Sequence, residues 1–527
     1  MGMNQLHFPI LSFITFWPLL GVFILLFINR KNETAIRIVT FVFMLIDFLV
    51  STLLYFYFDP TTWQPQFVDK IPWISSLGMN YYLGIDGLSL FLVILTTFLS
   101  VVGQFSTWSA IKEKVKEFNI VFLLLLTGML GVFESLDAFL FYVFWEFELI
   151  PMYLMIGIWG GPHRVFATMK FFLYTFAGSV FMLVAIMATY FLFHHYTGTY
   201  TFDMFQLASH PLPHHLQFWL FLAFFLAFAI KVPMFPFHTW LPWAHVEAPT
   251  AGSVLLAGVL LKMGTYGFLR FNLPMFPSMT HALGILVIVL AITGIFYGAV
   301  VAMVQPDWKK LVAYSSVSHL GYAMLGMFAL NSQGMEGSIM EMINHGVSTG
   351  ALFLMVGILY ERRHTRLFSE YGGIAAIMPR YAVLAGVVTL SSLGLPGTNG
   401  FISEFLCLIG AFKANIWYGI VVAGGAVVSA VYLLMMFQKV FYVKTRNVKN
   451  LGLKDLDLRE TVYMGICVLG ILWIGLYPNP LLSRMHVSVE HLLQHVNSYS
   501  KQITINVDKN LTCNKLAKIN VISRGGL

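Results

Sequence analysis

Long apolar runs recur along this chain, and short polar stretches separate them. Each run holds about 20 residues, which as an α-helix is enough to cross a hydrocarbon core of about 30 Å. A composition of 58% hydrophobic and 10% charged residues excludes an ordinary soluble protein. The pattern predicts an all-α polytopic membrane protein with about fourteen helices, at residues 8–28, 38–58, 88–108, 119–135, 138–159, 167–193, 217–235, 250–270, 282–304, 310–330, 337–360, 380–412, 416–441 and 460–478.

Lysine and arginine are concentrated in alternate loops of this pattern. They are Arg30, Lys31, Arg37, Lys112, Lys114, Lys116, Arg164, Lys309, Lys310, Arg362, Arg363, Arg366, Arg380, Lys444, Arg446, Lys449, Lys454 and Arg459. The positive-inside rule predicts that these loops are cytoplasmic and that both termini lie on the opposite side. The same loops account for the net charge of +7, so we expect no nucleic-acid partner.

Two lysines stand at bilayer depth in the seventh and eighth predicted helices. Lys231 is followed directly by Pro233 and Pro236, which interrupt the seventh helix, and Lys262 lies inside the apolar run 250–270. A charge at the bilayer centre costs about 2.5 to 3.5 kcal/mol, so it persists only beside a partner or water. A broken helix at that depth also needs protein or water around its backbone. The stretch is predicted to handle a cation or a proton.

The fifth predicted helix carries two carboxylates, Glu146 and Glu148. Residues two apart on a helix point to different faces, so at most one faces a given partner easily. A carboxylate that faces a lysine lowers the cost of burial for both groups. We expect Glu146 to be the partner of Lys231, and the role of Glu148 stays open.

Two histidines, His319 and His345, lie on the tenth and eleventh predicted helices, and the eleventh also carries Glu341. A lone membrane histidine is often a packing or hydrogen-bonding residue. Two of them on consecutive helices, between lysine and glutamate positions, indicate a proton relay.

The twelfth helix repeats the interruption of the seventh, because Gly394-Leu395-Pro396-Gly397 breaks it before Glu404. Broken helices at corresponding positions of two halves are typical of inverted-repeat transporters. The predicted division is 1–118 for three amino-terminal helices and a surface cap loop, 119–270 for the first repeat (helices four to eight), 271–441 for the inverted second repeat (helices nine to thirteen), and 442–527 for helix fourteen and a polar tail.

The three cysteines, Cys407, Cys467 and Cys513, are far apart, which gives neither a metal-ligand spacing nor a disulfide framework. No glycine-rich dinucleotide fingerprint follows a strand. We expect neither a metal nor a cofactor in this chain.

Five stretches, in this order, carry a resemblance to a known family. They read FWEFELIPMYLMIGIWG, AIKVPMFPFHTWLPWAHVEAPTAGSVLLAGVLLK, LVAYSSVSHLGYAMLG, INHGVSTGALFLMVGILYERRHTR and GLPGTNGFISEF. They are similar to the antiporter-like membrane subunits of respiratory complex I, the proton-translocating NADH:quinone oxidoreductase. The resemblance covers helices four to thirteen.

The resemblance implies a proton path made of Glu146, Lys231, Lys262, His319, His345 and Glu404. Glu404 matches a glutamate that one of these subunits carries where its sister subunits usually carry lysine. Trp243 and Val254 depart from the family, since many relatives carry an acidic residue at these positions. Both departures argue against a carboxylate there feeding the path.

The resemblance implies a multi-pass subunit of the bacterial cytoplasmic (inner) membrane with antiporter-like neighbours on both sides. It would move protons while partner subunits, which hold flavin, iron–sulfur clusters and quinone, pass electrons from NADH to quinone. The alternative is a subunit of a multisubunit sodium/proton antiporter, which uses a gradient and no redox partner; Glu404 argues against it. A purely structural scaffold would leave the buried charges unexplained.

Overall fold

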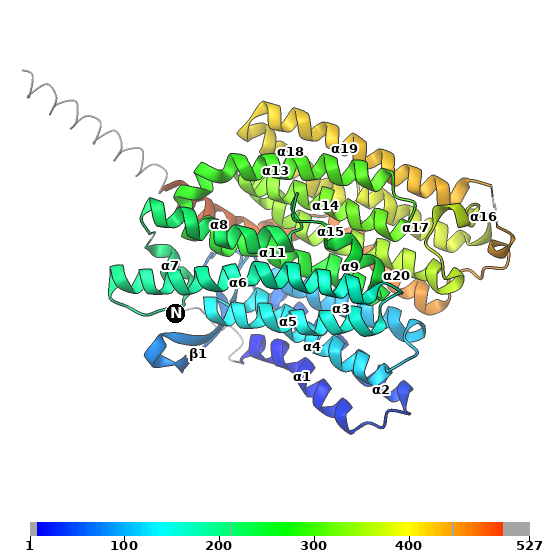
Figure 1. The fold of residues 1–527 in the computed structure, drawn as a ribbon, viewed down its shortest axis with the longest axis horizontal. Coiled ribbons are helices and arrows are strands. Elements are labelled where there is room, and N and C mark those ends of the chain that lie inside the picture. Colours follow the sequence, from blue (N-terminus) through cyan, green and yellow to red (C-terminus); the bar gives the residue numbers. More distant parts are fainter. Residues whose placement is uncertain (1–7, 211, 445–446, 499–527) are drawn as a thin grey trace, which may run out of the picture.

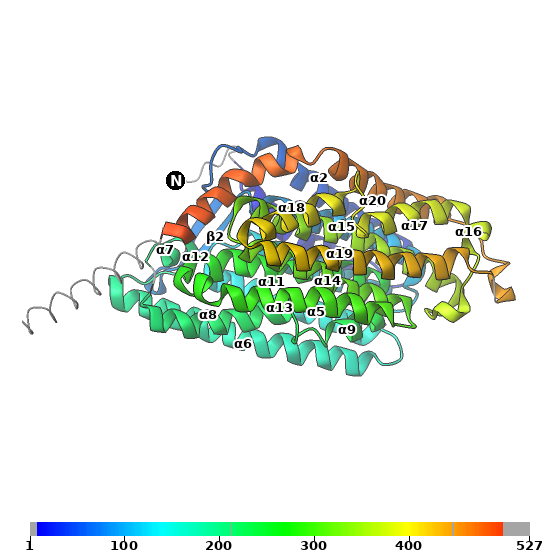
Figure 2. The same cartoon turned by 90° about the horizontal axis from the view of Figure 1, so that it is seen from above.

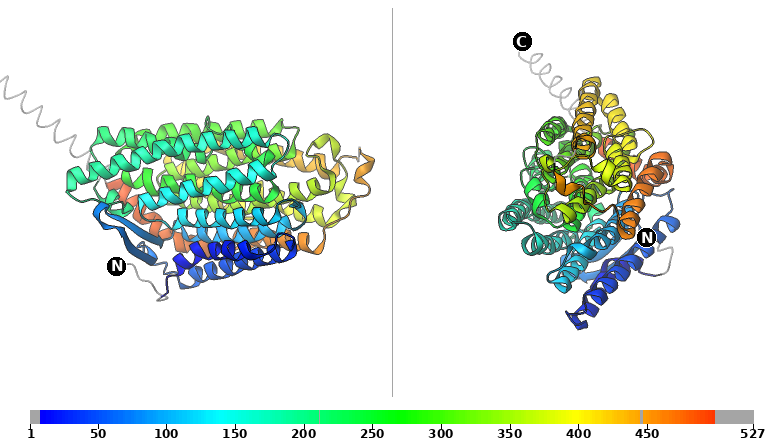
Figure 3. Two further views of the ribbon diagram at one scale, coloured as in Figure 1. Left: turned by 60° about the horizontal axis from the view of Figure 1, so that its bottom comes forward. Right: turned by 90° about the vertical axis from the view of Figure 1, so that its right-hand side faces the viewer.

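The long helices of this protein run side by side along one axis and form a single bundle (Figure 1). The computed structural model describes residues 8–210, 212–444 and 447–498. Seen along the helices, α1 (Ile10–Phe27) and α2 (Glu33–Tyr57) lie at one edge of the bundle, and α19 (Ile416–Phe437) lies at the opposite edge (Figure 3). The mostly helical membrane fold expected from the apolar runs is confirmed.

The helices of the amino-terminal half are α3 (Leu90–Ala110), α4 (Val115–Glu134), α5 (Ala138–Trp159), α6 (Arg164–Thr197), α7 (Met204–Ser209), α8 (His214–Lys231), α9 (Leu241–Glu247), α10 (Thr250–Leu255), α11 (Leu261–Gly267) and α12 (Leu273–Met275). Those that follow are α13 (Pro277–Met303), α14 (Trp308–Phe328), α15 (Ser332–Arg363), α16 (Ile374–Ile377), α17 (Pro379–Ser392), α18 (Asn399–Ala414) and α20 (Leu458–Leu476). Residues 479–498 are also helical. The tail from residue 499 onward, with Cys513, lies outside the described residues.

Two strands depart from the all-α expectation. β1 (Gln66–Ile74) pairs antiparallel with β2 (Met79–Ile85), and the hairpin lies at the same end of the bundle as α7 (Figure 1). The sequence predicted only a cap loop here. Both segments are rich in β-branched and aromatic side chains, which favour a pleated, half-buried surface.

Within the described residues, twelve helical segments are long and apolar enough to cross a membrane. The other two predicted spans correspond to α14 and to the pair α17 and α18. α14 is 21 residues long, but it carries lysines, serines and a histidine that lower its hydropathy. α17 and α18 are 14 and 16 residues long because the break at 393–398 divides them.

The eighth predicted span is helical throughout but irregular. Two π-helical turns, Leu256–Leu260 and Phe268–Asn272, lie on either side of α11. π-helical turns are rare and are frequently found at functional sites. Lys262 lies in the α-helical segment between them.

Close approach of α4 and α5 depends on Gly128. A Cβ atom at this position would lie 2.9 Å from the Cβ of Glu148 and 3.0 Å from its Cα. Real Cβ atoms do not come so close to a neighbouring backbone, so only glycine lets the two helices pack at this distance. Gly128 thereby sets how deeply Glu148 is buried.

The loops that carry the cations meet at one end of the bundle, as the alternation of charge predicted. Lys116 donates hydrogen bonds to the carbonyls of Leu26 and Ile28 at the end of α1, and Lys309 donates to the carbonyl of Ala248. In the described structure α16 lies at this end, opposite the hairpin (Figure 1).

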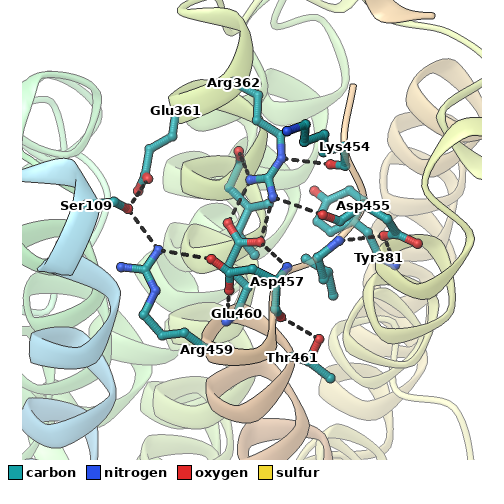
Figure 4. Close-up of polar contacts among 12 residues, drawn as sticks. Ser109, Glu361, Arg362, Tyr381, Lys454, Asp455, Asp457, Arg459, Glu460 and Thr461 are labelled. Atoms are coloured by element: carbon teal, nitrogen blue, oxygen red, sulfur yellow. Dashed lines mark hydrogen bonds and ion pairs between the residues drawn. The ribbon is translucent and has the colours of Figure 1, made fainter. Parts of the chain in front are cut away.

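An ionic cluster at this same end ties three helices together (Figure 4). Arg362 of α15 donates to both carboxylate oxygens of Glu460 of α20, at 2.7 and 2.6 Å. Ser109 of α3 donates to Glu361 and accepts from Arg459, both at 2.8 Å. A bidentate arginine–carboxylate contact is strong and directional, so the cluster holds the ends of α3, α15 and α20 in register.

We expect Gly128→Ala to destabilise the protein by about 1 to 3 kcal/mol, the usual effect of overpacking a filled interior. The midpoint of thermal unfolding in detergent measures this. Gly465→Ala in α20 is the matched control, because nothing lies within 4 Å of a Cβ at that position. Equal midpoints for the two variants would contradict the close-packing argument.

Candidate functional site

Lys231 is the last residue of α8, and its side chain points into the bundle against α5. Its ammonium group contacts Glu148 Oε1, and both residues are buried. The same nitrogen lies 5.2 Å from the centre of the Trp145 ring. The lysine thus has an anionic partner and an aromatic face, which together offset the cost of its burial.

The predicted pairing of Lys231 with Glu146 is therefore wrong, and the structure pairs the lysine with Glu148. Positions 141, 145, 148 and 152 of α5 follow helical spacing and all are buried, whereas Glu146 lies on a half-buried face with the exposed Ile150. The helix is apolar all round, so its sequence gives no amphipathic signal to choose between the faces. The packing of α4 and α8 makes the choice.

Lys262 and His345 form the second contact. Lys262 Nζ lies 2.7 Å from His345 Nδ1 and also donates to the carbonyl of Ala257 in the preceding π-helical turn. Lys262 is fully buried and His345 is 3% exposed. A lysine and an imidazole at this distance can pass a proton directly.

His319 and Glu404 form the third contact. His319 Nδ1 lies 2.9 Å from Glu404 Oε1, and the other ring nitrogen lies 3.2 Å from the hydroxyl of Tyr432. The rings of His319 and His345 are 5.9 Å apart between centroids. α14, α15 and α18 therefore place the two predicted histidines and the predicted glutamate together.

Glycines in the break between α17 and α18 make room for Glu404. Gly394 and Gly397 have φ angles of +78° and +91°, in the left-handed region that favours glycine. A Cβ at Gly394 would lie 3.0 Å from Glu404 Oε2. The break thus positions the carboxylate beside backbone that carries no side chain.

The six predicted residues come from α5, α8, α11, α14, α15 and α18, all of which belong to the one bundle (Figure 2). Among these helices α8 packs against α11, and α14, α15 and α18 pack against one another. Five of the six take part in the three contacts. Glu146 is the exception: the residue is half-buried, its carboxylate has a hydrogen bond with the Tyr142 side chain, and its Oε1 is buried with no hydrogen-bond partner in the described part of the chain.

Sequence reasoning missed His245, which is fully buried beside the eighth span. Its ring stacks on Phe353 with centroids 4.5 Å apart, and neither ring nitrogen has a hydrogen-bond partner among the described residues. Its position in LPWAHVEAPT, within one of the stretches that resemble the family, is the sequence feature that could have identified it. An imidazole without a partner can exchange a proton with water that enters the site.

Another buried pair, missed by sequence reasoning, lies toward the hairpin. Arg270 binds Asp86 through two contacts of 2.7 and 2.6 Å, and it donates to the hydroxyl of Tyr266 at 2.9 Å. The pair borders a cavity of about 340 Å³ that His491 also lines. The cavity is thus lined both by Asp86, which directly follows the hairpin, and by Leu269 and Arg270 at the end of the eighth span.

Comparison with known proteins gives the same family for sequence and fold. The family model for the transmembrane region of NADH:quinone oxidoreductase/Mrp antiporter proteins matches residues 135–431. The chain is 45% identical over 506 residues to NADH-quinone oxidoreductase subunit M of Rhodobacter capsulatus, covering 93% of this chain and 97% of the relative. It is 44% identical over 486 residues to NADH-ubiquinone oxidoreductase chain 4 of Arabidopsis thaliana, covering 92% and 97%.

Two solved structures share the fold. A chain of respiratory complex I from Thermus thermophilus with bound NADH superimposes with a TM-score of 0.84 at 33% identity, covering 92% of this chain and 99% of that chain. A chain of the Mrp complex from Dietzia sp. DQ12-45-1b gives 0.80 at 19% identity over 92% and 99%, which shows a likeness of fold alone.

We expect Gly394→Ala to destabilise the protein by about 1 to 3 kcal/mol, because a side chain in the left-handed region is strained. The new methyl group also displaces the carboxylate of Glu404 from His319. Thermal unfolding measures the first effect. Gly386→Ala in α17 is the matched control, since a Cβ there would lie 3.6 Å from the nearest atom, which is ordinary contact. Indistinguishable midpoints would contradict the role given to the turn.

Proposed function

Because this chain belongs to the family of NADH-quinone oxidoreductase subunit M and chain 4, the antiporter-like, proton-translocating membrane subunits of respiratory complex I, we propose that its buried charged side chains carry the protons. The observation that carries this proposal is the set of three contacts, Glu148–Lys231, Lys262–His345 and His319–Glu404, inside one bundle. Buried ionisable groups in a membrane are costly, and they mark ion pathways.

The proposed route runs from Lys231 to Lys262 and His345, and then through His319 to Glu404. Direct contact supports the steps within each pair. The 5.9 Å between the two imidazole centroids is short enough for a bridging water molecule. We assign the step between Lys231 and Lys262 to water as well, since both side chains belong to neighbouring packed elements, α8 and α11.

The ion pair of Lys231 works as the switch in this proposal. At about 4 Å and an effective dielectric constant near 20, two opposite charges attract by about 4 kcal/mol. Separation removes that attraction and drives a proton toward Lys262, because about 1.4 kcal/mol changes a proton equilibrium tenfold.

Glu146 also has a role in the proposed proton path, although it does not contact Lys231. The residue is half-buried on a face of α5 different from that of Glu148, its carboxylate has a hydrogen bond with Tyr142, and its Oε1 lacks a partner in the described structure. We propose that Glu146 transmits a change of charge in a neighbouring membrane subunit to the ion pair of this chain. A negative charge arriving there repels Glu148 and weakens the ion pair with Lys231.

We place the entry route for protons at the basic end of the bundle. A cavity of about 160 Å³ is lined there by Glu247, Thr250 and Lys309. Thr250 begins the helix that continues to Lys262, and His245 is buried two residues before Glu247. Protons would enter through this cavity and reach Lys262 through His245.

The proposal includes the finer topology. α14 and the pair α17 and α18 complete fourteen crossings, and residues 119–270 and 271–441 form two inverted repeats. The similar placement of the two breaks supports this, because each follows a helix that ends beside an ion pair. The chain lies in the cytoplasmic (inner) membrane of a bacterium between antiporter-like neighbours. The electron carriers, flavin, iron–sulfur clusters and quinone, belong to other subunits.

We expect Lys231→Ala and Glu148→Gln to lower NADH-driven proton pumping and NADH:quinone electron transfer together, by tenfold or more. Each variant leaves a buried charge unpaired, so the switch loses one of its two states. Glu146→Gln, the same chemical change two residues away, is expected to have a smaller effect. Pumping and electron transfer in membranes with a fully assembled complex measure all three.

Two results would count against this assignment. Near-wild-type pumping in Lys231→Ala would make the ion pair structural and would remove the proposed switch. A severe loss in Glu146→Gln, with Glu148→Gln close to wild type, would show that the functional partner of the lysine is Glu146.

The rival reading, a sodium/proton antiporter subunit, predicts exchange without electron transfer. The observation that supports it is the matching family model, whose description names Mrp antiporter proteins beside NADH:quinone oxidoreductase. We expect vesicles that contain this chain to show no sodium-driven proton movement when NADH oxidation is blocked by removing NADH. Sustained exchange under that condition would favour the antiporter.

A further inference from the structure

We propose that His319, Glu341 and Glu404 form a binding site for a divalent transition-metal ion such as Zn²⁺. Each residue offers one ligand atom, and the three atoms all lie within 4.8 Å of one another. One imidazole and two carboxylates are ligands that Zn²⁺ accepts, with bonds of about 2.0 to 2.2 Å. This site goes beyond the proton path, because Glu341 has no part in that path.

The geometry is close to what the ion needs. Ligand atoms in a tetrahedral site with bonds of about 2.1 Å lie about 3.4 Å apart, so side-chain movements of about 1 Å would close the site. His319 Nδ1 and Glu404 Oε1 are already 2.9 Å apart. Two carboxylates and a neutral imidazole also balance the charge of a divalent ion in a medium of low dielectric constant.

Neighbouring groups hold the ligands in place. Ser403 donates to Glu341 Oε2 at 2.6 Å, and the hydroxyl of Tyr432 lies 3.2 Å from His319 Nε2. Partners of this kind orient metal ligands, and a bond to the second ring nitrogen fixes which nitrogen of a histidine faces the metal. The arrangement therefore has an inner and an outer layer of polar groups.

An independent observation is the cavity beside the three ligands. It measures about 10 Å³, which is the space of about one water molecule, and His319, Glu341, Asn344, Ser392 and Glu404 line it. Asn344 Oδ1 and Ser392 Oγ are buried and have no hydrogen-bond partner in the described part of the chain. Unpaired oxygen atoms at a cavity are costly unless a ligand or water occupies it.

Binding is tested by equilibrium dialysis of the purified complex against Zn²⁺, with metal analysis of wild type and Glu341→Gln. Glutamine keeps the size of the side chain and can still accept from Ser403, so the fold is preserved. We expect the wild type to bind one more Zn²⁺ per complex than the variant, or to bind that ion at least tenfold more tightly. Glu404→Gln removes a ligand from a different helix and is expected to give the same loss.

The matched control is Glu361→Gln, which makes the same change at the other end of the same helix. It should retain the additional Zn²⁺. Equal stoichiometry and affinity in wild type, Glu341→Gln and Glu404→Gln would overturn the proposal.

Pumping measured with the same samples separates this site from the proposed proton path. If Zn²⁺ occupies the site, it blocks Glu404 and slows NADH-driven pumping in wild type more than in Glu341→Gln. Binding that depends on Glu341 but leaves pumping unchanged would support the metal site and count against proton transfer through Glu404.

Discussion

A lysine buried in a membrane bundle needs polar or negatively charged compensation close by, and that need constrains how the helices around it pack. Lys231 obtains this compensation from Glu148, and the contact requires α8 to end where it does and α5 to present that face. It also requires α4 to come close to α5 at Gly128. Removal of one member of a buried ion pair is costly, which is why this contact constrains three helices at once.

The same constraint appears again further along the bundle with different chemistry. Lys262 has an imidazole and a backbone carbonyl as partners, and Glu404 has an imidazole. Neutral or exchangeable partners hold a charge less firmly than a fixed carboxylate does. Along the bundle a strong ion pair is therefore followed by contacts in which a proton has more than one place to reside, a property that the proposed proton path uses.

Regular structure is interrupted where these groups lie. α8 ends at the first lysine, π-helical turns lie on either side of the second, and glycines with positive φ open the break before Glu404. Each interruption departs from the regular α-helical bonding pattern, and in a membrane such irregular backbone persists only inside protein or beside water. At the basic end, the cluster of Arg362 and Glu460 holds the surrounding helices in register. Regular helices thus support the irregular segments that carry residues of the proposed proton path.

The sequence alone determined the membrane class, the position of most helices, the two breaks and the residues that carry charge into the bilayer. Apolar length and the cost of buried charge are local properties, so they can be read one segment at a time. It also predicted that the basic loops meet at one end and that His319, His345 and Glu404 belong together. Only the tertiary structure decided that Glu148 is the partner of Lys231, and that Glu341 joins His319 and Glu404. An apolar helix carries no signal of which face is turned inward, since that depends on neighbours distant in sequence, such as Gly128.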